Sequence, residues 1–143
     1  MKEQMTLEKV NRFFLEDKFN CSQLVLTHAA EEVGLDRAAA LRIASAFGGG
    51  MYKENVCGCV TGALMALGLK YGNDHSDNEE ERKQIAAKTE EFFQKFTQEH
   101  DSIVCKDLLD KARSEGADAD PLSLYKNCPV FAVTACKVLD EIL

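Results

Sequence analysis

The chain has 143 residues, 45% of them hydrophobic, which is the size and composition of one globular domain. Seventeen Lys and Arg against 24 Asp and Glu give a formal net charge of −7. Because no basic face is visible, we expect no binding to nucleic acid. The longest apolar stretch covers only residues 56–69, short of the roughly 20 residues that cross a bilayer, so no membrane span is expected.

The first half of the chain has helical patterning. Apolar residues at helical spacing predict helices over residues 6–17 and 20–33. Gly34 is expected to end the second helix, and Asp36 to cap a third that reaches Phe47. Three consecutive glycines at 48–50 then interrupt the chain before the apolar, Gly-containing run at 55–72.

The second half continues the same pattern. A polar turn is followed by Ser76 and, three residues later, Glu79, which predicts a capping box ahead of a long helix over about residues 77–100. After Ser102 a further helical segment is expected, and residues 113–123 have the composition of a loop. A last helix is predicted from Asn127 or Cys128 to the end of the chain, with Pro129 in its first turn.

No segment alternates apolar and polar residues for long enough to form a strand. The sequence therefore predicts an all-α protein, a compact antiparallel bundle of five to seven helices that forms a single domain over residues 1–143. The first twenty residues lack the hydrophobic core of a signal peptide, so we expect a cytoplasmic protein.

The most informative feature is a set of six cysteines. Without a secretory signal a disulfide framework is disfavoured, which favours metal binding or redox chemistry. Five of the six lie within four residues after an Asn or Ser, and these are preferred helix N-caps, here Asn20, Asn55, Ser102 and Asn127. These five are Cys21, Cys57, Cys59, Cys105 and Cys128. Near a helix N-terminus the unpaired N–H groups and the helix dipole stabilise a thiolate. If the four helix starts converge, they form a pocket for a sulfide-containing cluster or for activated thiolates.

A simpler interpretation is that these cysteines only fill the core, because free cysteines are often buried as small apolar residues. We assign Cys136, which lies in the middle of the last helix, to the core. The spacing of the other thiols does not select a metal, since thiolate ligands suit zinc, Cu(I) and iron–sulfur clusters alike.

Histidines and glycines near these cysteines have two possible roles. His28 lies on the same helical face as Cys21 and is either a ligand or an interior residue, whereas His75 and His100 are expected to be solvated. Gly58 and Gly62 open a stripe of small residues that continues at Ala66. The stripe lets another backbone approach closely, or leaves room for a bulky cofactor beside the thiols, so Gly58 and Gly62 are candidate cofactor-binding residues.

Five segments together resemble a known family. They are NCSQ around Cys21, FGGGM at 47–51, CGCVTGALMALGLKYG at 57–72, SIVCKDLL at 102–109 and NCPVFAVTACKVLDEIL at 127–143. In this order they resemble the C-GCAxxG-C-C family, small bacterial and archaeal proteins described as redox-active.

The resemblance implies that the four family cysteines are Cys21, one of the central pair, Cys105 and Cys128. We prefer Cys57 for the central position, with Cys59 as an additional thiol, and Val60 stands where the family name has Ala. A relation to the iron–sulfur portion of split-Soret cytochromes is also implied, although the chain has no C-x-x-C-H haem attachment site.

Three functions remain open. The leading hypothesis is an electron-transfer or redox accessory protein with an iron–sulfur cluster on these cysteines and a redox protein as partner. The second is metal-free thiol–disulfide chemistry, in which Cys57 or Cys59 pairs with another thiol. The third is a structural zinc site or a plain helical interaction protein. Whether the protein is an enzyme stays open, and a homodimer through the small-residue stripe or the Phe-rich helix at 77–100 is expected.

Overall fold

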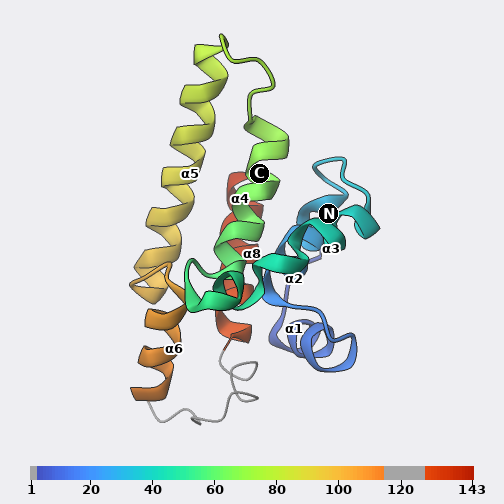
Figure 1. Ribbon diagram of the computed structural model, residues 1–143, viewed down its shortest axis with the longest axis vertical. Coiled ribbons are helices and arrows are strands. Elements are labelled where there is room, and N and C mark those ends of the chain that lie inside the picture. The colour runs from blue at the N-terminus through green and yellow to red at the C-terminus, as the bar shows by residue number, and fades with distance from the viewer. Residues whose placement is uncertain (1–2, 115–127) are drawn as a thin grey trace.

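The computed structural model describes residues 3–114 and 128–143 (Figure 1). The described residues confirm the all-α prediction. In chain order the α-helices are α1 (Leu7–Asn11), α2 (Cys21–Ala30), α3 (Arg37–Ala44), α4 (Gly58–Tyr71), α5 (Glu79–His100), α6 (Cys105–Ser114) and α8 (Pro129–Ile142). In this part of the chain the β-type pairing is a single antiparallel bridge between Val56 and Val104.

Helices α4, α5 and α8 run along the long axis, and α1 to α3 cover one side of them (Figure 1). Their shared core contains Phe92 and Phe96 of α5 together with Phe131 and Leu139 of α8. All four side chains are buried, so the apolar face of the long helix is used inside the chain. A homodimer would have to form through another surface.

The closest helix contact joins α2 and α4. A Cβ atom built on Gly62 of α4 would lie 2.7 Å from the carbonyl oxygen of Ser22 in α2, and one on Gly58 would lie 2.5 Å from Cys21 Sγ. Ala66 is fully buried one turn further on. The small-residue stripe therefore serves close packing within the chain and is not available to a partner.

The predicted start of the third helix and the turn after the second are confirmed. The side chain of Asp36 accepts a hydrogen bond from the Ala39 amide at the start of α3, and Gly34 after α2 has φ +73°. Between Arg12 and Glu16 the first helix widens into one π-helical turn, which is followed by Lys18 at φ +61°. The helix predicted over residues 6–17 is thus found from Leu7 to Glu16, with its last turn π-helical.

The predicted capping box of the long helix is wrong. Helix α5 begins at Glu79, and its N-cap is Asn78, whose side chain accepts a hydrogen bond from the Glu81 amide at 3.2 Å. Ser76 lies in the preceding turn, where its carbonyl accepts a hydrogen bond from Arg82. Asn is as good an N-cap as Ser, and its position two residues later sets the start of the helix. Helix α6 also extends into the predicted loop as far as Ser114; the rest of that loop and Asn127 lie outside the described residues.

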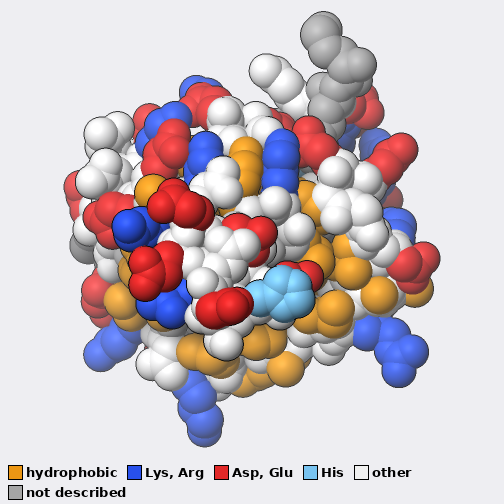
Figure 2. Space-filling view, turned by 90° about the horizontal axis from the view of Figure 1, so that it is seen from above, with side chains coloured by type: hydrophobic (Ala, Val, Ile, Leu, Met, Phe, Trp, Pro, Cys, Tyr) orange, Lys and Arg blue, Asp and Glu red, His pale blue; other side chains and the backbone are white. Residues whose placement is uncertain are grey.

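The end of the molecule that carries the α4–α5 connection is highly charged. Figure 2 shows acidic and basic side chains interspersed there, with hydrophobic side chains along one edge of the view. Among the described residues, no helix combines the length and the apolar character needed to span a membrane.

A cavity lined by five cysteines as the candidate functional site

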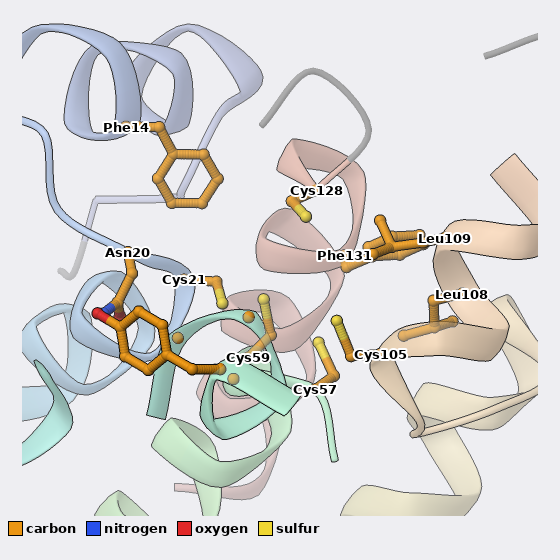
Figure 3. Close-up of a pocket in the computed structure, with 14 residues that line it drawn as sticks. Phe14, Asn20, Cys21, Cys57, Cys59, Cys105, Leu108, Leu109, Cys128 and Phe131 are labelled. Atoms are coloured by element: carbon orange, nitrogen blue, oxygen red, sulfur yellow. The ribbon is translucent and has the colours of Figure 1, made fainter. Parts of the chain in front are cut away.

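One cavity of about 230 Å³ lies where α2, α4, α6 and α8 begin (Figure 3). Its walls contain all five cysteines that the sequence places near helix starts. These are Cys21, Cys57, Cys59, Cys105 and Cys128. The sequence left open whether the four helix starts converge, and in the structure they do.

The first thiol stands at the start of α2 as expected. Asn20 is the N-cap, and its side chain accepts a hydrogen bond from the Gln23 amide at 2.9 Å. The Gln23 side chain accepts one in return from the Asn20 amide, which completes a capping box. Cys21 is thus the first residue of the helix, where its sulfur is close to free backbone N–H groups.

The second start differs from the prediction, because Asn55 does not cap α4. Residues 55–57 pair with residues 103–105. The Cys57 amide donates a hydrogen bond to the Ile103 carbonyl at 2.7 Å, and the Cys105 amide donates one to the Asn55 carbonyl at 2.5 Å. The helix can begin only after this pairing ends, so Cys57 itself is the N-cap and Cys59 lies in the first turn.

The same pairing brings two distant segments together. Since Val56 is bridged to Val104, Cys57 and Cys105 become neighbours although 48 positions separate them (105 − 57 = 48). Figure 3 shows their side chains next to one another. Ser102 is not the N-cap of α6 as predicted; its hydroxyl accepts a hydrogen bond from the Val104 amide at 3.0 Å and supports the turn before the helix.

The fifth thiol completes the cavity from α8. Cys128 is the N-cap of this helix and Pro129 is its first residue, as expected from the sequence. Burial and the nearby thiols of Cys21, Cys57 and Cys105 raise the pKa of Cys128 above its usual value. Cys128 is partly exposed, whereas the other four thiols of the cavity are buried.

The side chains of Cys21 and Cys59 interact directly. Their side chains are hydrogen-bonded, and this bond is the largest cause that lowers the pKa of Cys21 to about 7. Backbone N–H groups of Gly49, Ser22 and Cys21 act in the same direction. The pKa of Cys59 is raised in turn, first by its hydrogen bond to Cys21 and then by that to Cys57. Cys21 is therefore the thiol of the pair that ionises more readily, with Cys59 as its hydrogen-bond partner.

Several walls of the cavity were not predicted from the sequence. Four are apolar side chains that come from three different helical segments, namely Phe14, Leu108, Leu109 and Phe131. Another wall is the loop after α3, which contributes Gly48, Gly49 and Tyr52. The motif FGGGM was the available signal for this loop, but without the structure it indicates only that the helical pattern is interrupted there. Gly58 lines the cavity, whereas Gly62 is not among the lining residues and faces Ser22.

The remaining cysteine and the histidines lie elsewhere. Cys136 is fully buried in the core, as expected. His28 does not line the cavity; its Nε2 lies 3.0 Å from the Asp140 carboxylate. His75 is exposed as expected, but the expectation for His100 is wrong, because its ring packs between Phe96 and Phe131 and is hydrogen-bonded to Thr134 at 2.8 Å.

As the side chains of the described residues are placed, no group of three or more Cys, His, Asp or Glu is arranged so that it could hold a metal ion. The donor set nevertheless suits a soft group. Five thiols line the cavity, and among the described residues no carboxylate or imidazole lines it. Soft thiolates select zinc, Cu(I) or iron–sulfur clusters, and helix N-termini favour a negatively charged group.

The model of one protein family matches residues 19–142, and its description reads "Putative redox-active protein (C_GCAxxG_C_C)". No curated protein and no solved structure matches the chain. The matched range contains every helix that contributes a cysteine to the cavity. The chain therefore belongs to the C_GCAxxG_C_C family.

Proposed function

We propose that this chain is a redox protein that holds an iron–sulfur cluster in the cavity at the helix starts. Cys21, Cys57, Cys105 and Cys128 are its ligands, and Cys59 is a fifth thiol beside them. The observation that supports this proposal is that thiols from four separate helix starts line one cavity of about 230 Å³.

The size and the walls of the cavity favour a cluster over a single ion. A mononuclear zinc site draws its thiolates to about 2.3 Å from one point. Here the thiols surround a hollow, which suits a group that brings its own sulfide and spans more space. The four helix N-termini would stabilise the negative charge of such a group.

When bound, the cluster would supply one-electron redox chemistry. The chain's own residues bind and shield it. Phe14, Leu108, Leu109 and Phe131 keep water away from the thiols, and the backbone N–H of Gly49 donates a hydrogen bond to Cys21 Sγ. A second redox protein is the partner that gives or receives the electron. We place this function in the cytoplasm, in agreement with six cysteines that are all free.

The test is purification and reconstitution without oxygen, followed by measurement of iron, acid-labile sulfide and the visible spectrum. We expect stoichiometric iron and sulfide in the wild-type protein. Replacing any one of Cys21, Cys57, Cys105 or Cys128 by Ser should remove most of the iron. Cys136→Ala is the matched control, since it removes a thiol outside the cavity. A wild-type protein without iron, sulfide or a chromophore would refute the cluster.

A second candidate function is metal-free thiol–disulfide exchange, and the hydrogen bond between Cys21 and Cys59 favours it. The Cys21 thiolate would attack a small disulfide such as oxidised glutathione, forming a mixed disulfide and releasing one glutathione thiolate. Cys59 would then lose its proton and attack Cys21 Sγ, releasing the second glutathione. The protein loses two electrons and the Cys59 proton, and the glutathione disulfide is reduced to one thiol and one thiolate.

This alternative has a separate measurement. Metal-free protein is titrated with defined ratios of reduced and oxidised glutathione, and intramolecular disulfides are identified by mass spectrometry of peptides. A reversible Cys21–Cys59 disulfide in protein that binds no iron supports exchange. Zinc in the protein as isolated, with unfolding on chelation, would instead indicate a structural metal site.

A further inference from the structure

Asn20 has a contact that its role as an N-cap does not require. Its side-chain oxygen accepts the hydrogen bond from the Gln23 amide, while its side-chain nitrogen donates one to the carbonyl of Ser45 at 3.0 Å. Ser45 begins the 3-10 turn at Ser45–Phe47. This turn leads directly into residues 48–50, which we call the glycine loop. One side chain therefore joins the start of α2 to the segment before Gly48.

The glycine loop is closely fitted to this side chain. A Cβ atom built on Gly48 would lie 2.4 Å from Asn20 Cγ, so no larger residue fits at 48 while Asn20 keeps its place. The next residue, Gly49, has φ +59°, a conformation that glycine adopts without strain. Gly49 lines the cavity together with Cys21, and its backbone N–H is one of the groups that lower the pKa of the Cys21 thiol. The loop thus turns directly after its contact with Asn20 and presents one amide to the thiol next to Asn20.

We infer that Asn20 is a positioning residue that holds the Gly49 amide on Cys21 Sγ and thereby sets the reduction potential of the group bound in the cavity. The inference rests on the proposed iron–sulfur function. Hydrogen bonds to ligand sulfurs tune cluster potentials. Because reduction adds negative charge, an N–H donor stabilises the reduced form more than the oxidised form and raises the potential.

The main test is Asn20→Ser. Serine keeps the N-cap acceptor but cannot reach Ser45, and it adds no charge. The matched control is Asn78→Ser, the same replacement at the N-cap of α5, which does not line the cavity. In dye-mediated titrations of the reconstituted protein, we expect Asn20→Ser to lower the equilibrium constant for one-electron reduction about tenfold, which corresponds to about 59 mV. Asn78→Ser should keep the wild-type potential.

A second variant moves the loop without changing Asn20. Gly48 has φ −65°, so Gly48→Ala carries no backbone strain and acts only through the clash with Asn20. We expect it to lower the potential as Asn20→Ser does. Gly68→Ala is its control, because a Cβ there meets no atom within 4 Å. Potentials of Asn20→Ser and Gly48→Ala that match those of the two controls would overturn the inference.

Hydrogen exchange of the Gly49 amide in metal-free protein separates this inference from the proposed function. We expect exchange to become at least tenfold faster in Asn20→Ser and Gly48→Ala than in the wild type, and unchanged in the two controls. If the wild type binds no iron but this pattern is found, the cluster is refuted and the positioning role of Asn20 is retained. If exchange at Gly49 is the same in all variants, the positioning role is refuted whatever the iron content.

Discussion

Gly62 of α4 lies directly against Ser22 of α2, and the two helices touch there through their backbones. A Cβ atom added to Gly62 would lie 2.7 Å from the Ser22 carbonyl oxygen and 3.3 Å from the Ser22 Cα. Ser22 follows Cys21, and Gly62 lies one turn after Gly58, whose own Cβ would meet Cys21 Sγ. The close approach of the two helices therefore fixes the distance between the thiols at their starts.

Gly62→Ala should accordingly destabilise the fold. The neighbouring atoms are backbone and cannot rotate away, so we expect a loss of about 1–3 kcal/mol in the free energy of unfolding, typical of overpacking. Gly68→Ala in the same helix is exposed and meets no atom within 4 Å, so it should stabilise the protein by about 0.5–1 kcal/mol. Urea denaturation measures both. Equal effects of the two substitutions would contradict the close contact.

Gly50 gives a second matched comparison, at the side of the cavity near Cys105. Its φ is +62°, and an added Cβ would lie 2.5 Å from the Asn55 amide nitrogen and 2.8 Å from Cys105 Cβ. Gly34 has a similar φ of +73° but open space around it. Gly34→Ala should therefore cost only backbone strain, about 1–2 kcal/mol.

Gly50→Ala adds a clash to the same strain. We expect a total loss of about 2–5 kcal/mol, the sum of the strain and an overpacking cost of about 1–3 kcal/mol. Thermal or urea unfolding of the two alanine variants checks the difference. A Gly50→Ala protein as stable as Gly34→Ala would show that the loop does not press against Cys105.

The sequence was sufficient to predict the all-α fold and to place five cysteines near helix starts. Helical periodicity is a local property, and an N-cap residue before a cysteine is visible in the chain. The shared local setting of five thiols suggested a common pocket, but whether the helix starts meet depends on contacts between distant segments. The assignment of Cys136 to the core followed from its mid-helix position, and the structure buries it fully.

Other parts of the site depend on contacts between distant segments. Asn55 is a residue type that often serves as an N-cap, but its carbonyl accepts a hydrogen bond from the Cys105 amide. Because of this pairing the N-cap of α4 is Cys57, two residues later. His100 stands in a polar stretch of sequence, yet Phe131 from α8 covers its ring. Neither partner can be identified from local sequence, because both come from other helices.

The Cys21–Cys59 pair predicts a pH dependence for thiol reactivity in reduced, metal-free protein. Only the thiolate is nucleophilic, and the pKa of Cys21 is lowered to about 7. Alkylation of Cys21 by iodoacetamide should therefore be half-maximal near pH 7 and fall at lower pH. In Cys59→Ala the largest cause of the lowered pKa is lost, so the midpoint should move to higher pH.

Mass spectrometry of alkylated peptides, followed across pH, measures this midpoint for Cys21 itself. Cys136→Ala should leave it unchanged, since Cys136 does not line the cavity. An unchanged midpoint in Cys59→Ala would show that Cys59 is not the donor to Cys21.

The environment of His100 predicts a loss of stability in mild acid. Burial lowers the pKa of His100 below its usual value of 6.5. Above pH 6.5 the imidazole is neutral in both the folded and the unfolded chain. As the pH falls below 6.5, the unfolded chain binds a proton at His100 before the folded chain does. The free energy of unfolding therefore decreases, until the pH is below the pKa of His100 in the folded chain.

His100→Gln should remove this part of the pH dependence, whereas His75→Gln, at an exposed side chain, should keep the wild-type slope. Urea unfolding of the three proteins at several values between pH 5 and pH 8 measures the slopes. The difference between wild type and His100→Gln isolates the contribution of His100 from that of the His28–Asp140 pair, which both proteins retain. Parallel curves for wild type and His100→Gln would mean that His100 titrates alike in the folded and unfolded chains, contrary to its packing between Phe96 and Phe131.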